Sequence, residues 1–272
     1  MRIKSLLALT ASLSLATACV VEEDLTSDDI SSLQQEGRTG KASGYVSLGA
    51  SITFGVGATN FVGHTDGFAE YLELAVFEND TDFANLAVPG ATSGEVLLDQ
   101  LDPAIPFVAT HKKDGLVVSV AGGGNDLLRF LNSPDFAICF QPDPTACFLT
   151  IGGILAEVDA NLDAVVAKLR KTGGDDATII LRTQYNSFRR TGCDQTGGTI
   201  AALGDAALEG FPGTPLVGLN NVIRGVAARH DALVAEVFLP FAFNPDAFVG
   251  PDCVHPTDAG YDVLLGVFTS LL

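Results

Sequence analysis

Basic residues are scarce in this sequence: 15 Lys and Arg stand against 33 Asp and Glu, which gives a formal net charge of −18 at pH 7. This surplus of acidic groups repels the phosphates of nucleic acids and the headgroups of anionic membranes, so neither is an expected partner. Charged residues make up only 18% of the 272 residues, whereas hydrophobic residues make up 47%. This composition supports a sizeable core and argues against a mainly disordered chain.

The apolar run near the start of the sequence is too short to span a bilayer. It covers residues 5–15, whereas a transmembrane helix needs about 20 residues. Residues 1–4 before it are basic, and residues 16–18 after it include the small side chains that a signal peptidase reads. We therefore expect residues 1–18 to be a signal peptide and the mature chain to be exported.

A cysteine follows this cleavage site directly. Cys19 stands where a bacterial lipoprotein carries its lipid, although the leucine usual three residues earlier is Ala16 here. We expect Cys19 to be lipidated in the cell envelope; ordinary secretion after cleavage at Ala18 is the alternative. Residues 19–43 are acidic and polar with no useful apolar stripe, so we expect a tether. Residues 44–272 are then the folded domain.

Cysteine is also infrequent, and four cysteines remain beyond Cys19. An even number in an exported chain suggests two disulfides, and four cysteines allow three pairings. Cys139 and Cys147 flank a loop with two prolines, which favours a local bridge and leaves Cys193 to pair with Cys253. Free buried thiols are the alternative.

Apolar strands and amphipathic helices alternate along the folded domain. The expected strands are residues 45–48, 83–88, 116–121, 178–182 and 232–238; the expected helices are residues 68–77, 94–101, 151–171, 216–230 and 258–272, the last with Thr257 as its N-cap. Five strands separated by helices predict a parallel, doubly wound sheet. Such sheets bind ligands beyond the carboxyl ends of their strands, so the loops there are the informative ones.

Three loops carry side chains suited to catalysis. Ser51 follows the first strand, the glycine-rich residues 122–126 follow the third, and Asp252 and His255 stand near the end of the chain. An aspartate three residues before a histidine can hydrogen-bond the imidazole and support its charged form. Serine is a poor nucleophile until an adjacent base activates it. Together these residues can form a catalytic triad.

Each of these motifs also has an ordinary structural role. Ser51 could shape a turn, Asp126 could cap a helix, and Asp252 could cap a loop beside a surface histidine. Zinc binding through Asp252, Cys253 and His255 would need a further ligand, and no second cluster supplies one. We therefore expect neither a metal nor a cofactor.

Two better-known motifs are incomplete. The Gly-x-Ser-x-Gly elbow of the α/β-hydrolases is absent, because Thr53 occupies the position of its last glycine. Residues 55–60 begin like a dinucleotide-binding fingerprint but lack its third glycine. Both an α/β-hydrolase and a nucleotide-binding protein are therefore disfavoured.

Four blocks in order resemble the SGNH family, also called GDSL-type hydrolases. They are residues 49–51 (GAS), 85–90 (NLAVPG), 123–126 (GGND) and 252–256 (DCVHP). The resemblance covers the whole folded domain. It implies a flavodoxin-like three-layer α/β/α sandwich with a central five-stranded parallel sheet, and ester hydrolysis without a metal.

The resemblance also implies roles for the motif residues. The implied triad and oxyanion hole consist of the nucleophile Ser51, the base His255, its orienting acid Asp252, the N–H groups of Ser51 and Gly90, and the side chain of Asn125. The family's aspartate before the serine is Ala50 here, which puts the geometry of that loop in question. A non-catalytic ligand-binding lipoprotein on the same scaffold is therefore the alternative to an esterase.

We expect a monomer that acts on small-molecule, lipid or carbohydrate esters and meets a membrane only through a lipid on Cys19. Residues 183–186 follow the fourth strand and are expected to line the cleft. Five phenylalanines in or near the ligand-side loops could form an acyl pocket, although core packing is the simpler role for each: Phe54, Phe130, Phe136, Phe188 and Phe243.

Overall fold

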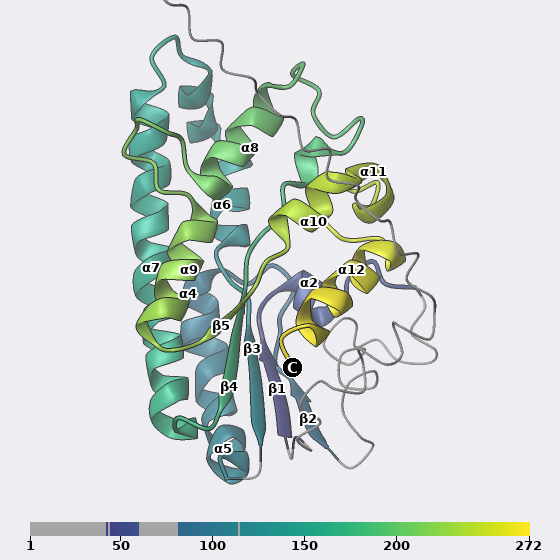
Figure 1. Ribbon diagram of the computed structural model, residues 1–272. Coiled ribbons are helices and arrows are strands. Elements are labelled where there is room, and N and C mark those ends of the chain that lie inside the picture. The colour runs from purple at the N-terminus through teal and green to yellow at the C-terminus, as the bar shows by residue number, and fades with distance from the viewer. Residues whose placement is uncertain (1–41, 43, 60–80, 114) are drawn as a thin grey trace, which may run out of the picture. The chain divides into compact units, whose positions relative to one another are not determined.

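Five strands form one parallel sheet in the computed structural model, which describes residues 42, 44–59, 81–113 and 115–272 (Figure 1). The strands are β1 (Gly44–Leu48), β2 (Asp82–Asn85), β3 (Leu116–Val120), β4 (Thr178–Arg182) and β5 (Leu233–Ala235). Their order across the sheet is β2-β1-β3-β4-β5, and every neighbouring pair is parallel. This is the flavodoxin-like order, so the predicted sheet is confirmed.

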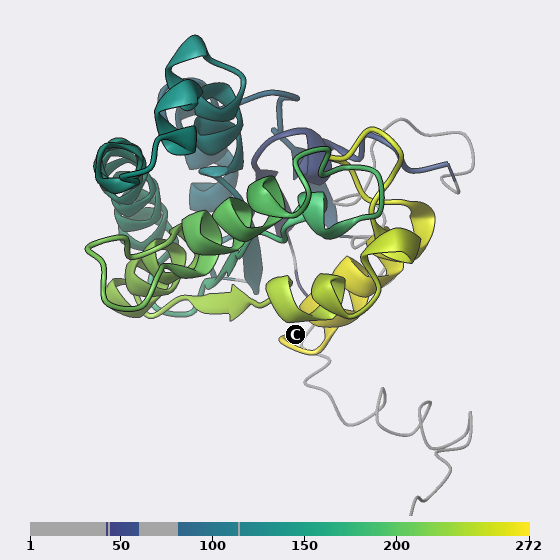
Figure 2. The same cartoon turned by 90° about the horizontal axis from the view of Figure 1, so that it is seen from above.

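Helices cover both faces of this sheet because its strands are apolar on both sides. Side chains alternate between the faces along β1: Val46 and Leu48 join one hydrophobic cluster and Tyr45 joins the other. The helices that pack on the first face are α5 (Leu101–His111), α7 (Thr145–Gly173) and α9 (Leu219–Arg229); those on the second are α10 (Phe238–Phe243) and α12 (Asp258–Thr269). Figure 2 shows the two helical layers on opposite sides of the strands. The predicted three-layer α/β/α sandwich is confirmed.

The remaining elements connect strands to these helices. They are α2 (Ser51–Phe54), α4 (Ser93–Glu95), the π-helix η1 (Val96–Gln100), α6 (Gly124–Leu131), the 3₁₀ helices η2 (Pro134–Phe140) and η3 (Ser187–Arg189), α8 (Thr199–Glu209) and α11 (Pro245–Phe248). Of these, α2, α6 and η3 follow the carboxyl ends of β1, β3 and β4. They therefore bring their residues to the edge where doubly wound sheets bind ligands.

Two predicted helices are longer in the structure. The helix expected at residues 94–101 continues through η1 and α5 to His111, although α5 contains Pro106. Proline is a helix-breaking signal in a sequence, which is why the pattern predicts an early end. Helix α7 begins at Thr145 rather than at residue 151. The sequence pattern misses its first turns because they carry no clear apolar periodicity.

The last predicted strand is shorter than expected, and one predicted helix cannot be assessed. β5 ends at Ala235, and Phe238 already begins α10, so the strand expected at residues 232–238 was wrong in its final part. The apolar residues beyond β5 pack as a helix instead. Thr257 caps α12 as predicted, since its side chain accepts a hydrogen bond from the Gly260 N–H. The helix expected at residues 68–77 lies outside the described residues.

Two disulfides cross-link the domain; one joins two helical segments and the other joins two loops. Cys139 of η2 is bonded to Cys147 of α7, with Cα atoms 4.8 Å apart. Cys193, after η3, is bonded to Cys253, before α12, with Cα atoms 5.5 Å apart. Both bonds are the pairs expected from the sequence, the local Cys139–Cys147 bond and the remaining Cys193–Cys253 bond.

The described residues all lie within a single unit, Gly40–Leu272. Across the described ranges, no helix combines the length and apolar character needed to cross a bilayer.

Candidate active site

Ser51 is the first residue of α2, just beyond the carboxyl end of β1. The short helix is anchored from the opposite layer, since the Tyr261 hydroxyl of α12 donates to the carbonyls of Ile52 (3.3 Å) and Val56 (2.8 Å). Among the described residues, the Ser51 hydroxyl forms no hydrogen bond. The serine is therefore fixed in place while its hydroxyl remains available.

The turn before Ser51 is held by a residue that no sequence motif marks. Gln100, at the end of η1, is buried. Its side-chain Nε2 donates to the Gly49 carbonyl at 2.8 Å, and its Oε1 accepts from the Gly49 N–H at 2.8 Å. A glutamine in a helical segment has no motif around it, so only the fold brings it to this turn.

Asp252 and His255 form a hydrogen-bonded pair. The carboxylate Oδ2 of Asp252 lies 2.5 Å from Nδ1 of His255, and Oδ1 accepts the backbone N–H groups of Val254 (3.1 Å) and His255 (3.0 Å). Partial burial works to raise the pKa of Asp252, but these hydrogen bonds together lower it below its ordinary value of 3.8. Asp252 therefore stays ionised and holds the ring with Nε2 facing away from it.

The loop that carries this pair is anchored on both sides. The Tyr185 hydroxyl donates to the Val254 carbonyl at 2.6 Å, and the Gly250 N–H donates to the His255 carbonyl at 2.7 Å. Cys253, between the acid and the base, has a φ of 62°, which an L-residue seldom adopts without support. Its disulfide to Cys193 supplies one such constraint.

A glycine after α2 lies against the loop that carries His255. Gly57 has a φ of 94°, and a Cβ added there would lie only 3.0 Å from the Pro256 carbonyl oxygen and 3.3 Å from His255 Cβ. The loop that leaves α2 thus contacts the histidine loop. Val254 and Ser51 also border the same cavity. The structure therefore brings the three predicted triad residues to one edge of the sheet.

The predicted oxyanion residues face the same edge. Gly90 has a φ of 83°, and a Cβ there would meet nothing within 4 Å. Asn125, near the start of α6, donates from Nδ2 to the Ala91 carbonyl at 2.9 Å. Asp126 accepts hydrogen bonds from the Ser93 N–H (2.9 Å) and hydroxyl (2.8 Å). Helix α6 is thus tied to the chain just after Gly90.

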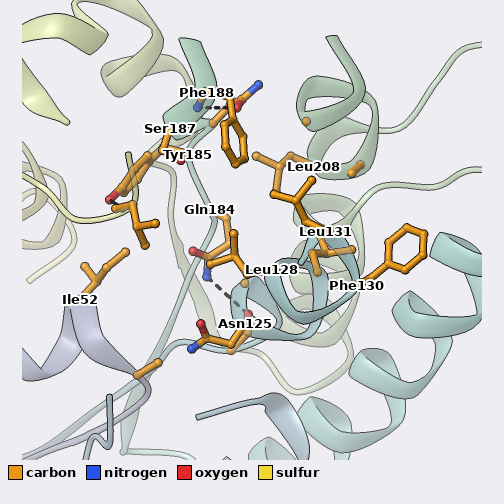
Figure 3. Close-up of a pocket in the computed structure, with 18 of the residues that line it drawn as sticks. Ile52, Asn125, Leu128, Phe130, Leu131, Gln184, Tyr185, Ser187, Phe188 and Leu208 are labelled. Atoms are coloured by element: carbon orange, nitrogen blue, oxygen red, sulfur yellow. Dashed lines mark hydrogen bonds between the residues drawn. The ribbon is translucent and has the colours of Figure 1, made fainter. Parts of the chain in front are cut away.

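A cavity of about 150 Å³ opens beside Ser51 and Asn125. Figure 3 shows Ile52 and Tyr185 toward one end of it, and Phe130 toward the other. The other predicted residues that border it are Gln184, Asn186, Phe136 and Phe188, whereas Phe54, Phe243 and Thr183 do not. Phe243 is instead 91% exposed on α10. Asp252, His255 and Gly90 do not border it, although Val254 and Ala91 next to them in the sequence do.

One buried charge also borders the cavity. Arg182 ends β4, and burial lowers the pKa of its guanidinium. Its Nε has no hydrogen-bond partner within the part of the chain that the structure describes, and Nη1 donates only to the Thr183 carbonyl. Arg182 follows Ile180 by two residues, so it belongs to the sheet face that carries Tyr261 and α12.

The Cys193–Cys253 disulfide removes one of the three ligands that zinc binding near His255 would use. The sulfur of Cys253 is bonded to Cys193 and is not a thiolate. No group of three or more His, Cys, Asp or Glu suited to a metal is found among the residues described.

Comparison with known proteins decides the family. A model described as the GDSL-like lipase/acylhydrolase family matches residues 47–263. The chain belongs to this family. Its general activity is accordingly that of a lipase or esterase, a class of hydrolase.

Individual relatives are distant but cover most of the chain. The spore germination lipase LipC of Bacillus licheniformis is 24% identical over 226 residues, which cover 81% of this chain and 92% of LipC. A lipase from a goat rumen metagenome has a TM-score of 0.60 at 21% identity, covering 84% of this chain and 96% of its own. An extracellular lipase from Streptomyces rimosus has a TM-score of 0.58 at 24% identity, covering 85% and 100%. At these identities the two structures establish a shared fold.

Proposed function

We propose that this protein is an exported serine esterase in which Ser51, His255 and Asp252 act as a catalytic triad. The observation that carries the proposal is the 2.5 Å contact between Asp252 and His255 at the sheet edge where Ser51 stands. An ionised Asp252 fixes the tautomer with Nε2 free to accept a proton, and it stabilises the imidazolium that forms.

The reaction follows from these positions. Ser51 Oγ attacks the ester carbonyl while His255 Nε2 takes its proton, which forms a tetrahedral intermediate. His255 then returns the proton to the departing alcohol as the C–O bond breaks. The resulting acyl-enzyme is hydrolysed when His255 activates a water, releasing the acid and restoring the Ser51 hydroxyl.

Negative charge on the carbonyl oxygen needs donors that are already in place. We assign this role to the N–H groups of Ser51 and Gly90 and to the Asn125 side chain. The hydrogen bond from Asn125 to the Ala91 carbonyl supports the assignment because it orients the amide beside Gly90. One such donor contributes about 2.7–4 kcal/mol by mutation in serine hydrolases.

The proposed substrates are carboxylic esters of small molecules, lipids or carbohydrates. Lipid esters are supported by the names of the relatives, several of which are lipases. We also propose that residues 1–18 are removed on export, that Cys19 carries a lipid at the end of the tether 19–43, and that residues 44–272 act as a monomeric catalytic domain. Mass spectrometry of the mature N-terminus tests the anchor; an unmodified Cys19, or another first residue, would contradict it.

A serine-directed organophosphate separates this esterase from a non-catalytic binding lipoprotein, the alternative that Ala50 suggests. We expect the wild-type protein to gain the mass of one probe group, attached at Ser51, and Ser51→Ala to gain none. Ser187→Ala is the matched control, because Ser187 borders the same cavity and should not affect labelling. An unlabelled wild-type protein, or labelling that survives Ser51→Ala, would contradict the proposal.

A further inference from the structure

The cavity beside Ser51 combines polar lining residues with one long apolar wall. Ser51 and Asn125 border it where the ester would react. The polar residues Arg182, Gln184, Asn186 and Ser187 also border it. The wall that α6 and α8 provide beyond Asn125 is apolar: Leu127, Leu128, Leu131, Leu203, Ala207 and Leu208. Figure 3 shows Leu128 and Leu131 between Ile52 and the distant Phe130. The apolar wall therefore leads away from the reaction site and offers a surface that a hydrocarbon chain can contact.

Aromatic rings line the far end of the cavity. Phe130 and Phe136 both border it and meet edge to face, with centroids 5.6 Å apart. Phe136 packs in the same way on Phe140, at 5.3 Å. Phe130 is only 9% exposed. A chain entering from Ser51 thus meets packed rings rather than open solvent.

A disulfide holds this end in place. Phe136 belongs to η2 and Ile151, which also borders the cavity, belongs to α7. The Cys139–Cys147 bond joins these two elements, and Cys147 and Ile151 lie on one face of α7 because they are four residues apart. The end wall is therefore covalently braced.

We propose that this cavity binds the acyl chain of the substrate and limits the length of that chain to about six carbons. The size follows from the cavity volume, since a cavity of about 150 Å³ lined by Leu, Ile and Phe accommodates benzene. The inference rests on the proposed ester hydrolysis at Ser51. It makes the enzyme selective for short and medium acyl chains, and it assigns Phe136 as the residue that sets the limit.

The test is kcat/KM for p-nitrophenyl esters from acetate to palmitate. Each methylene that the cavity covers should raise kcat/KM about fourfold, since burying a methylene favours binding by a nearly constant increment. The rise should stop near hexanoate, and longer chains should be hydrolysed more slowly. Phe136→Ala should raise the ratio of decanoate to hexanoate hydrolysis at least about tenfold by opening the end wall.

Two further variants serve as a control and as a milder substitution at position 136. Phe243→Ala removes an exposed phenylalanine that does not border the cavity, so the chain-length profile should match the wild type. Phe136→Leu provides a smaller opening should Phe136→Ala fail to fold, and it should shift the profile in the same direction.

The outcomes distinguish the acyl limit from ester hydrolysis itself. A wild-type profile that rises steadily to palmitate, or an unchanged profile in both Phe136 variants, would overturn the inference while leaving the esterase intact. If the wild type hydrolyses no ester, the proposed function fails, and calorimetry of hexanoate and palmitate binding to Ser51→Ala decides the cavity's role. Tighter binding of hexanoate supports the limit; tighter binding of palmitate overturns it.

Discussion

Gln100 pairs with Gly49 through both polar atoms of its side chain, as donor to the carbonyl and acceptor from the N–H, each at 2.8 Å. Gly49 stands two residues before Ser51, and Ala50 between them replaces an aspartate of the family motif. The turn that carries the serine is thus braced from η1 rather than by a carboxylate at position 50.

Removing the Gln100–Gly49 hydrogen bonds should lower kcat by a larger factor than the loss of folding stability alone would cause. Gln100→Met keeps the shape of the side chain but leaves the buried Gly49 N–H without a partner, which costs about 1–3 kcal/mol. The Gly49 carbonyl loses the Gln100 donor but keeps the Val88 N–H at 3.1 Å. We expect kcat to fall by up to about a hundredfold as Ser51 shifts by about 1 Å. Steady-state kinetics and thermal unfolding of the purified variant measure both effects.

Tyr45→Phe is the control for that experiment. It removes a buried hydroxyl bonded to Ser119 at 2.9 Å, near the other end of β1 from Ser51. It should lower the melting temperature without lowering kcat. If Gln100→Met loses no more activity than Tyr45→Phe, Gln100 does not position the serine.

Asn125→Ala should slow turnover with little change in fold. The amide is assigned to the oxyanion, so its loss should lower kcat by about 10²–10³-fold and leave KM nearly unchanged. Asn132→Ala tests the same side-chain type at the other end of α6, where Asn132 caps the helix by bonding the Leu128 carbonyl. Equal kinetics for the two variants would rule out an oxyanion role for Asn125.

Loss of the disulfide at Cys253 should lower the catalytic rate under conditions where the protein is still folded. Cys193→Ala frees Cys253, which lies between Asp252 and His255 and has a φ of 62°. A shift of about 1 Å in His255 can cost about a hundredfold in rate, so we expect a loss of that order while circular dichroism still reports the folded sheet. A thiol reductant should have the same effect on the wild type.

The second disulfide provides the comparison for this prediction. Cys139→Ala breaks the bond to α7, so it should leave the hydrolysis of acetate esters close to that of the wild type. Full activity of Cys193→Ala, or an equal loss in both variants, would show that the Cys193–Cys253 bond does not orient the histidine.

Asp252 should stabilise the fold only while it is ionised. Its pKa lies below 3.8 in the folded protein and near that ordinary value when unfolded, so its stabilising contribution is present above the unfolded pKa and is lost as pH falls through the folded pKa. The wild type should therefore melt above Asp252→Asn at about pH 5, and the gap should narrow toward about pH 2. Melting curves across this pH range measure the difference in melting temperature between the two proteins. A difference that grows as the pH falls would refute the prediction.

The architecture was accessible from the sequence because the central strands β3 and β4 are mostly apolar. Residues 178–182 and 116–121 read as buried strands, and β4 and β3 occupy almost the same residues. Helix α5 was missed because Pro106 interrupts its pattern, yet packing of Val108 and its neighbours against the sheet stabilises it. Tertiary burial outweighed the local signal there.

The site was predictable where short motifs place residues and unpredictable where distant elements converge. Asp252 and His255 are three residues apart, so their hydrogen bond follows from local geometry. The contact of Gln100 with Gly49 and the wall that Phe136 provides depend on how η1 and η2 pack. Periodicity within one segment carries no information about such contacts.

Ester hydrolysis by Ser51→Ala shows whether Ser51 is the nucleophile. We expect kcat/KM for a short p-nitrophenyl ester to fall at least about 10⁴-fold, because no nucleophile remains for His255 to activate. His255→Ala should lose activity on a similar scale. Ser270→Ala, at the end of α12 and away from the cavity lining, should remain near the wild type. All three variants should keep the wild-type circular dichroism spectrum. Activity of Ser51→Ala within about tenfold of the wild type would contradict the assignment of Ser51 as the nucleophile.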